Sequence, residues 1–264
     1  MLTITVLHYQ SRELTDECLF WIDRQTLPFA KGELRKVVID NGSPSHYSTE
    51  RDWEIIRLEK NRGNIGGQNT CFQYSNDGWV LFVANDVNIR NDGSILSLYS
   101  KALRNAEYCG QVQPSLVKPG LSVPENVGRV IFKLNKYKDN SGLKIRWPGF
   151  GISYHGKMPF VDAVTSTCYI MRKKVWQEIG GFDESLPGAY EDVDMGIRLR
   201  KKGYRLYFDP NNWVDHLGNA TLRYTKKDRW RFHEARKQVI RKHYRGFDQW
   251  LRLKACDLIH AIQP

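Results

Sequence analysis

Short apolar runs alternate with amphipathic segments along the N-terminal half of the chain. The runs that predict β-strands lie at residues 2–7, 37–39, 54–58 and 79–84. Apolar residues recur every four positions at Leu14, Cys18 and Ile22, with Ser11 as a candidate N-cap, and again between residues 95 and 106. Strands alternating with helices in this way predict an α/β fold with a mostly parallel sheet.

Polar clusters follow three of the predicted strands. They are Asp40-Asn41-Gly42-Ser43, the glycine-rich stretch 61–67 and Asn85-Asp86-Val87-Asn88. In open α/β sheets, ligands bind at the carboxyl ends of the strands. The sequence therefore places a candidate site at this edge.

The rest of the chain divides into an irregular stretch and a regular one. Residues 118–159 are rich in Gly and Pro and predict long loops with a β-ribbon; Arg146, Trp147, Tyr154 and His155 in it are candidates for shaping an acceptor side. Regular structure resumes at 163–172 and 175–179. A helix is then expected from about Glu191, because Val193 and Ile197 lie four residues apart.

Carboxylates gather at the start of this last helix. Glu191 and Asp194 share one face, and Asp192 points about 100° away from Glu191. A carboxylate ionised at a helix N-terminus can serve as a general base for a hydroxyl. The ordinary alternative is charge that complements the helix dipole, with an Asp194–Arg198 ion pair.

Other candidate residues are weaker when taken one at a time. Asp86, directly after a buried strand, could hold Mg²⁺ or Mn²⁺ on a diphosphate, or could be part of an ordinary turn. Asp40 could accept the N3–H of uracil or thymine. Gly66 and Gly67 could let a ligand approach the backbone, or could belong to a flexible turn. An isolated histidine such as His216 is more often structural than a ligand.

Charge is distributed unevenly over the 264 residues. The chain has 40 Lys and Arg against 29 Asp and Glu, a formal net charge of +11 with a pI near 9.4. Residues 223–254 contain 12 basic and 3 acidic residues, which leaves +2 for all other residues together. The excess positive charge therefore belongs to a basic C-terminal arm. This distribution argues against a nucleic-acid binder, which remains an alternative.

Composition also bears on location. With 41% hydrophobic residues, the chain can form a core. Its longest apolar run, residues 79–84, is far shorter than the ~20 residues of a membrane span, and residues 1–6 show no basic signal-peptide region. The five cysteines are odd in number and widely spaced, which indicates reduced thiols and no zinc module. We therefore expect a cytoplasmic protein.

The order of these motifs resembles glycosyltransferase family 2, whose members are inverting enzymes of the GT-A fold, and within it the rhamnosyltransferase-like branch. The resemblance runs from Thr3 to about Gly218. The segments that carry it are His8-Tyr9-Gln10, residues 38–43, 61–69, 81–87 and 167–172, Gly181-Phe182-Asp183-Glu184, Glu191-Asp192-Val193-Asp194 and His216.

The resemblance implies a fold and a division of the chain. Residues 1–222 would form a Rossmann-like GT-A catalytic domain, a mixed, mostly parallel sheet flanked by helices. Residues 223–264 would form a basic, amphipathic helical extension.

The resemblance also implies residue roles. Tyr9 and Asp40 would hold the nucleotide base, and the loop containing Asn64, Gly66 and Gly67 would lie against the donor. Asn85 and Asp86 would face the donor diphosphate. Asp86 and His216 would be ligands of the divalent metal. Asp192 would be the base that deprotonates the acceptor hydroxyl, and Glu191 would support it.

Two residues depart from the family pattern. Ala84 stands where Asp or Asn is usual, so metal ligation rests on Asp86, His216 and phosphate. Gln10 stands where Asn is commoner. The expected function is transfer of a sugar from a nucleoside diphosphate donor, with dTDP-rhamnose first and a UDP-hexose next, to a glycan or lipid-linked acceptor. A silent sugar-nucleotide binder is the alternative.

The basic arm admits two interpretations that can coexist. Apolar residues recur at helical spacing from Phe232 to Ile262, interleaved with basic and aromatic side chains. Such helices can dock on an anionic membrane. They can equally pack their apolar side on the catalytic domain and turn the basic side to solvent.

Overall fold

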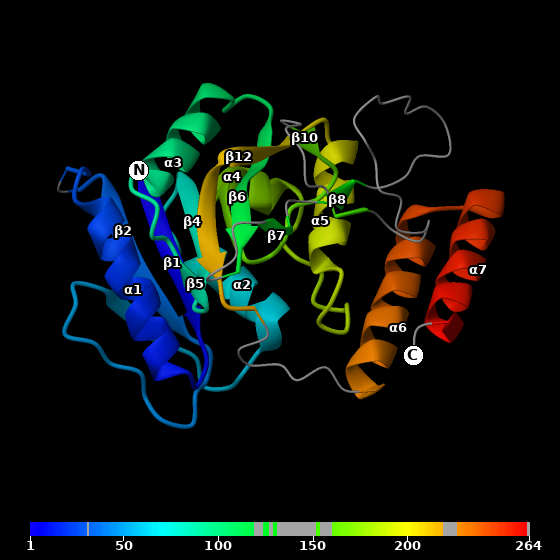
Figure 1. Cartoon of the computed structure of the whole chain (residues 1–264), viewed down its shortest axis with the longest axis horizontal. Coiled ribbons are helices and arrows are strands. Elements are labelled where there is room, and N and C mark those ends of the chain that lie inside the picture. The colour runs from blue at the N-terminus through cyan, green and yellow to red at the C-terminus, as the bar shows by residue number, and fades with distance from the viewer. Residues whose placement is uncertain are drawn as a thin grey trace.

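A central β-sheet with helices on both faces forms the body of the protein, and two helices lie side by side at one end (Figure 1). The structure is a computed structural model that describes residues 1–30, 32–118, 124–126, 129–130, 152–153, 160–218 and 226–262. Its strands are β1 (Leu2–His8), β2 (Leu34–Asp40), β3 (Glu54–Arg57), β4 (Trp79–Ala84), β5 (Val87–Asn88), β6 (Cys109–Val117), β7 (Pro124–Asn126), β8 (Arg129–Val130), β9 (Ile152–Ser153), β10 (Phe160–Val161), β11 (Cys168–Arg172) and β12 (Arg205–His216). Its helices are α1 (Arg12–Thr26), α2 (Gly63–Tyr74), α3 (Ser94–Arg104), α4 (Lys173–Glu178), α5 (Glu191–Lys201), α6 (Lys226–His243) and α7 (Gly246–Ile262).

The sheet is mixed, with a parallel half and a half that contains antiparallel pairs. Its strand order is β10-β12-β6-β11-β4-β1-β2-β3; β5 pairs with β12, and β7 with β6. Strands β3, β2, β1 and β4 run parallel, whereas β11 is antiparallel to β4 and β6. The predicted mixed α/β fold is confirmed, and its uninterrupted parallel run is the N-terminal half.

Two hydrophobic layers lie on opposite faces of this sheet. Successive side chains of a strand point to opposite faces, so Val38 packs on one side with α1 and α3, and Val37 and Ile39 pack on the other. The second layer includes residues of α2, α5 and the C-terminal helices, among them Phe72, Val193 and Val239. The helices that carry the polar motifs are thereby anchored to the sheet through their apolar sides.

Most predicted elements are present, with changed boundaries. Helix α1 begins after Ser11, whose side chain makes no capping bond, and the strand that ends at His216 is 12 residues long. Within the irregular stretch, β8 and β9 pair antiparallel as a predicted ribbon would. Arg146, Trp147, Tyr154 and His155 lie outside the described residues.

Helices α6 and α7 form the predicted C-terminal arm (Figure 1). In the described part of the chain, no helix is long and apolar enough to cross a membrane. All five cysteines are buried and free.

Candidate active site

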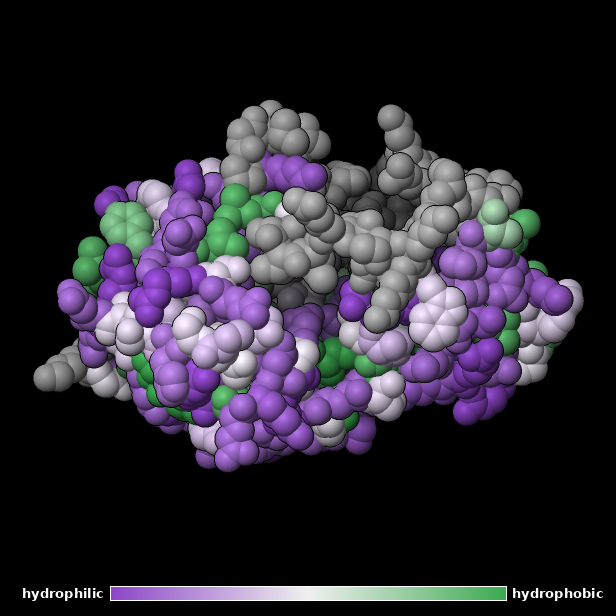
Figure 2. All heavy atoms as spheres, turned by 90° about the horizontal axis from the view of Figure 1, so that it is seen from below, coloured by the Kyte–Doolittle hydropathy of each residue, from purple (hydrophilic) through white to green (hydrophobic). Residues whose placement is uncertain are grey.

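Parallel pairing brings the ends of three strands to one edge of the sheet. In the register of β1, His8 lies opposite Asp40 of β2, and Leu7 lies opposite Ala84 of β4. The polar residues that follow these strands therefore share that edge. Figure 2 looks at the molecule from below, the side toward which β1 runs, and the described residues on that face are mostly hydrophilic.

Asp86 and His216 meet at this edge, although they are 130 positions apart in the chain. His216 ends β12 and pairs with Val87 of β5, so the short β5 places the two side chains together. Asp86 Oδ2 lies 3.4 Å from His216 Nε2, and the side chains are 16% and 22% exposed. Leu217 N–H also donates to the Asp86 carbonyl at 3.0 Å. The structure brings together the two predicted metal ligands.

This pair fits a divalent cation in its chemistry. Carboxylate oxygen and imidazole nitrogen both ligate first-row metals such as Mn²⁺, and both side chains reach the surface. Across the described ranges, however, no group of three or more His, Cys, Asp or Glu side chains is arranged to hold a metal ion. Two protein ligands suit a metal that completes its shell with phosphate oxygens and water. Ala84, at the end of β4, adds no ligand.

Asn85 and Tyr9 lie near the start of α1. Asn85 Nδ2 donates to Thr15 Oγ1 at 3.1 Å, and the same hydroxyl lies 2.7 Å from His8 Nδ1. Burial lowers the pKa of His8, and the neighbouring Asp40 partly offsets this effect. Tyr9 follows His8, and its hydroxyl accepts a hydrogen bond from Gln10 Nε2 at 3.2 Å. These contacts connect the ends of β1 and β4.

Asp40 is fully buried at the end of β2. Its oxygens accept hydrogen bonds from the backbone N–H groups of Ser43 (3.0 Å) and Tyr47 (3.3 Å) and from Arg57 (2.6 Å). Burial alone would raise the pKa of Asp40, but these donors hold it below its ordinary value. The carboxylate thus organises the turn after β2. Its role in base recognition stays a prediction.

The glycine-rich stretch is helical rather than a loop, which corrects the prediction for Asn64, Gly66 and Gly67. Helix α2 begins at Gly63, and Asn41 joins it to β2 by donating to the Gly63 carbonyl and accepting from Arg62 N–H. Asn and Gly disfavour helices intrinsically, so tertiary contacts decide the conformation here.

Gly66 and Gly67 allow close packing of α2. A Cβ on Gly67 would lie 2.7 and 2.8 Å from the methyl groups of Leu7, and one on Gly66 would lie 2.8 Å from Arg62 Cβ. Leu7 belongs to β1, so the bare backbone of Gly67 sets the spacing between helix and sheet. This observed packing supplies a structural reason for both glycines that involves no ligand.

Glu191 and Asp192 open helix α5, as predicted. Glu191 Oε1 accepts a hydrogen bond from Asn64 Nδ2 at 3.2 Å, which joins α5 to the start of α2. Asp192 is 7% exposed, and its Oδ1 accepts the Val193 N–H at 2.8 Å. The predicted base therefore lies beside the predicted donor-side helix.

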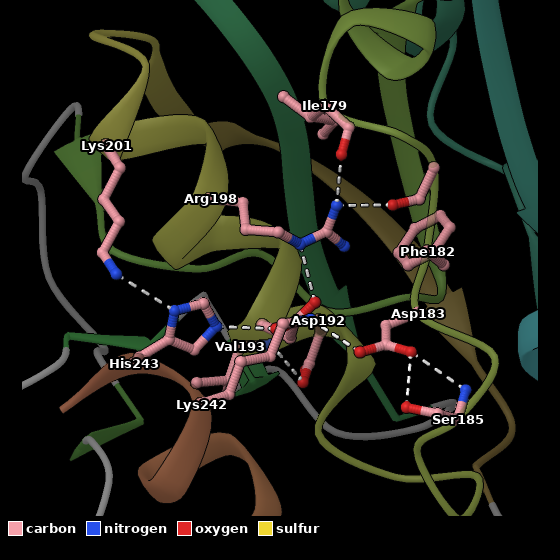
Figure 3. A network of polar contacts seen from close by, with 12 residues as sticks. Ile179, Phe182, Asp183, Ser185, Asp192, Val193, Arg198, Lys201, Lys242 and His243 are labelled. Atoms are coloured by element: carbon pink, nitrogen blue, oxygen red, sulfur yellow. Dashed lines mark hydrogen bonds and ion pairs between the residues drawn. The ribbon is translucent and has the colours of Figure 1, made fainter. Parts of the chain in front are cut away.

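Asp194 has a different environment from its two acidic neighbours, and its partners Arg198, Lys242 and His243 are labelled in Figure 3. Its fully buried carboxylate lies 2.7 Å from Arg198 Nε, 2.8 Å from Lys242 Nζ and 2.6 Å from His243 Nε2. Burial would raise the pKa of Asp194, but His243, Arg198 and Lys242 lower it to about 2. The expected Asp194–Arg198 pair is present, and two further partners come from the C-terminal arm.

Sequence reasoning missed several residues that organise this region. Arg57 ends β3 directly opposite Asp40, so strand register could have suggested this pair. In the sequence, Thr15 looks like an ordinary polar position of a helix, so its contacts with His8 and Asn85 could not be predicted. Lys242 and His243 belong to the basic arm, and nothing in their spacing indicates a partner 49 residues earlier.

Comparison with known proteins agrees with this architecture. Residues 147–244 match the model of a family described as glycosyltransferase-like family 2. A mannosyltransferase of Pyrobaculum calidifontis, solved with GDP-mannose and Mn²⁺, superposes with a TM-score of 0.61 at 14% identity, covering 99% of this chain and 70% of the other. Residues 147–244 are therefore similar to this glycosyltransferase-like family, and the whole chain shares its fold with the mannosyltransferase.

Two curated relatives are longer than this chain and match it over part of their own length. The pre-mycofactocin glycosyltransferase of Mycobacterium tuberculosis is 25% identical over 197 residues, 72% of this chain and 39% of that protein. The O-antigen biosynthesis protein RfbC of Myxococcus xanthus is 36% identical over 61 residues, 23% of this chain and 5% of that protein. The alignments therefore span less than two-fifths of the length of these relatives.

A Gly67→Ala substitution tests whether this glycine is needed for packing. The added methyl group would press on Leu7, and we expect a loss of about 1–2 kcal/mol in unfolding free energy, overpacking being partly offset by helix propensity. Urea denaturation at neutral pH measures this loss. Gln73→Ala, on the exposed side of α2, is the control and should stay within about 0.5 kcal/mol. A Gly67→Ala midpoint at or above that of the wild type would contradict the packing role.

Proposed function

We propose that the chain is an inverting glycosyltransferase that moves a sugar from a nucleoside diphosphate to a hydroxyl group. The observation that carries this proposal is that a candidate metal-binding pair and a candidate catalytic base lie at one edge of the sheet. Asp86 lies 3.4 Å from His216 on one part of this edge, and Glu191-Asp192 are tied to α2 through Asn64 on another. The GT-A-like fold and the family match support the same conclusion.

Asp192 is our candidate for the general base. In the proposed reaction the acceptor oxygen bonds to the anomeric carbon, the bond from that carbon to the diphosphate oxygen breaks, and the acceptor proton passes to Asp192. A base must lie within hydrogen-bond reach of that proton. Glu191, held by Asn64, would support the acceptor side.

Asp86 and His216 are our candidates for holding Mg²⁺ or Mn²⁺ on the donor diphosphate. A bound cation would act as a Lewis acid on the leaving group. Asn85, Tyr9 and Asp40 are retained as proposed contacts to the phosphates and base. Asn64, Gly66 and Gly67 would act through the start of α2, whose N-terminus suits phosphate oxygens.

We also propose which donor and which acceptor the enzyme uses. We place dTDP-rhamnose first and a UDP-hexose second, with a glycan or lipid-linked acceptor in polysaccharide biosynthesis. The similarity to a protein named for O-antigen biosynthesis supports an acceptor in polysaccharide biosynthesis. A sugar-nucleotide binder without catalysis is the second candidate, because Ala84 stands where the resemblance leads us to expect Asp or Asn.

Asp192→Asn is expected to lower transfer by about 10²- to 10⁴-fold, since the amide cannot accept the acceptor proton. Release of dTDP or UDP from the donor panel measures turnover, and calorimetry should show unchanged binding of the same nucleotide. Asp77→Asn, an exposed carboxylate before β4, is the matched control. Retention of more than about a tenth of wild-type turnover would remove Asp192 as the base. A wild-type chain that binds donors but never releases nucleotide would favour the binder.

Asp86→Ala and His216→Ala are each expected to reduce the affinity gained from Mn²⁺ by about tenfold or more, because each removes one of two protein ligands. Calorimetric titration with UDP and dTDP, with Mn²⁺ and then with EDTA, measures this gain without any turnover. Asp77→Ala should behave as wild type. Equal affinities in Mn²⁺ and EDTA for the wild-type chain would contradict the metal assignment.

The outer side of α7 supports the proposed contact with an anionic membrane. Phe247, Trp250 and Leu258 are 73%, 53% and 54% exposed, and the Phe247 and Trp250 rings stack at 5.6 Å. Exposed Lys254 lies between them at helical spacing, whereas Cys256 on the other side is buried. An exposed apolar ridge with a basic residue such as Lys254 beside it can bind a membrane interface.

Replacing both Phe247 and Trp250 by Ala is expected to weaken vesicle binding about tenfold or more, because each buried aromatic ring contributes about 1.5–3 kcal/mol. Co-sedimentation with phosphatidylcholine vesicles, with and without about one-third phosphatidylglycerol, measures binding. Tyr108→Ala, which removes an aromatic ring 49% exposed on the sheet side, is the control. The proposal would be contradicted if wild-type protein did not bind anionic vesicles and instead self-associated in ultracentrifugation, with the double variant remaining monomeric.

A further inference from the structure

Helix α6 contacts the residues on both sides of Asp192. Tyr190 precedes α5, and Asp194 lies two positions after Asp192 in its first turn. The Asp194 N–H donates to the Tyr190 carbonyl at 3.0 Å and so closes this turn. The turn that carries Asp192 is therefore held at both of its ends.

At the Asp194 end, α6 supplies two donors (Figure 3). His243, with a side chain 4% exposed, lies 2.6 Å from Asp194 Oδ1, and Lys242 lies 2.8 Å from the same oxygen. The other ring nitrogen of His243 lies 3.3 Å from Lys201 Nζ, a group that can only donate. His243 Nδ1 then accepts from Lys201, and Nε2 donates to Asp194.

At the Tyr190 end, the backbone is unusual and is gripped from the same helix. Tyr190 has φ 62°, a left-handed conformation that residues other than Gly seldom adopt. Arg236 Nε donates to the Tyr190 hydroxyl at 2.8 Å, and its guanidinium lies 5.3 Å from the ring centroid. Phe232 meets the same ring edge-on at 6.5 Å. Such backbone strain persists where surrounding contacts over-determine it.

Lys242 extends the contact to the segment before α5. Its Nζ lies 2.6 Å from Asp183 Oδ2, while Arg198 donates to the carbonyls of Ile179 and Gly181 at 2.7 Å each. The loop, α5 and α6 thus share one ionic network. These contacts join residues on both sides of the boundary that we expect between residues 222 and 223. The match to the family model also crosses this boundary and continues to residue 244.

We propose that Arg236, Lys242 and His243 of α6 are positioning residues that hold Asp192 in place for catalysis. This inference rests on the proposed function of Asp192, and it assigns the first part of the basic arm to the active site. None of the three is proposed to touch substrate. They act through Tyr190 and Asp194, whose placement fixes the intervening backbone.

His243→Phe tests the proposal, with His243→Gln as the conservative variant that can still donate to Asp194. We expect His243→Phe to lower kcat by roughly 10- to 100-fold, because small misplacements of a catalytic group have effects of this size. The Kd for UDP or dTDP should stay within about twofold of wild type, and His243→Gln should recover most of the loss. Arg241→Ala, an exposed residue of the same helix, is the control and should match wild type.

Two further measurements separate positioning from simple damage to the fold. Calorimetric stoichiometry counts binding-competent sites, so activity that falls only in proportion to stoichiometry would overturn the proposal. Hydrogen–deuterium exchange at the Asp194 amide needs no turnover and should become at least about tenfold faster in His243→Phe than in Arg241→Ala. Unchanged exchange there would also overturn it. If Asp192→Asn lost turnover while His243→Phe kept wild-type kinetics, the positioning role would be refuted and the proposed function of Asp192 would stand.

Discussion

A carboxylate with no access to water must be compensated by donors, and the arrangement of α5 and α6 depends on this requirement at Asp194. The desolvation of an unpaired buried charge is costly enough to unfold a domain of ordinary stability. Three cationic or polar donors surround Asp194, and two of them lie on α6. The C-terminal arm therefore cannot be considered a detachable appendage. Its first helix completes the electrostatics of the helix that begins with Glu191 and Asp192.

Four aspartates of the family-like motifs have two kinds of environment. Asp40 and Asp194 are fully buried, and the donors around them lower their pKa values, so their negative charge organises the chain internally. Asp86 is partly exposed beside His216, and Asp192 lies at the start of a helix joined to the sheet edge. This division would let one short acidic motif combine a structural carboxylate with the chemistry that we propose for Asp192. Within Glu191-Asp192-Val193-Asp194, the last carboxylate stabilises the turn that presents the second.

The strands were predictable because burial leaves a direct mark on the sequence. β4 coincides with the apolar run at residues 79–84. β1 is longer than its predicted run by His8, and β2 is longer by residues 34–36 and Asp40. The start of α2 was missed because Gly63, Asn64, Gly66 and Gly67 have weak helix propensity. Contact of Gly67 with Leu7 and of Asn41 with the start of α2 stabilises a helix that local preference disfavours. The placement of Asp86 near His216 followed from resemblance alone, since no local pattern relates β4 to the end of β12.

The amino-acid sequence by itself determined the class of fold, the strand ends where polar residues gather, the basic character of the arm and the order of motifs that indicates a glycosyltransferase-like domain. These properties depend on composition and on periodicity over a few residues. The tertiary structure alone decided which carboxylates are consumed by internal donors, that glycines 66 and 67 serve helix packing, and that α6 reaches the first turn of α5. Such contacts join residues tens to more than a hundred positions apart, and their energies depend on burial and register, which no local pattern encodes.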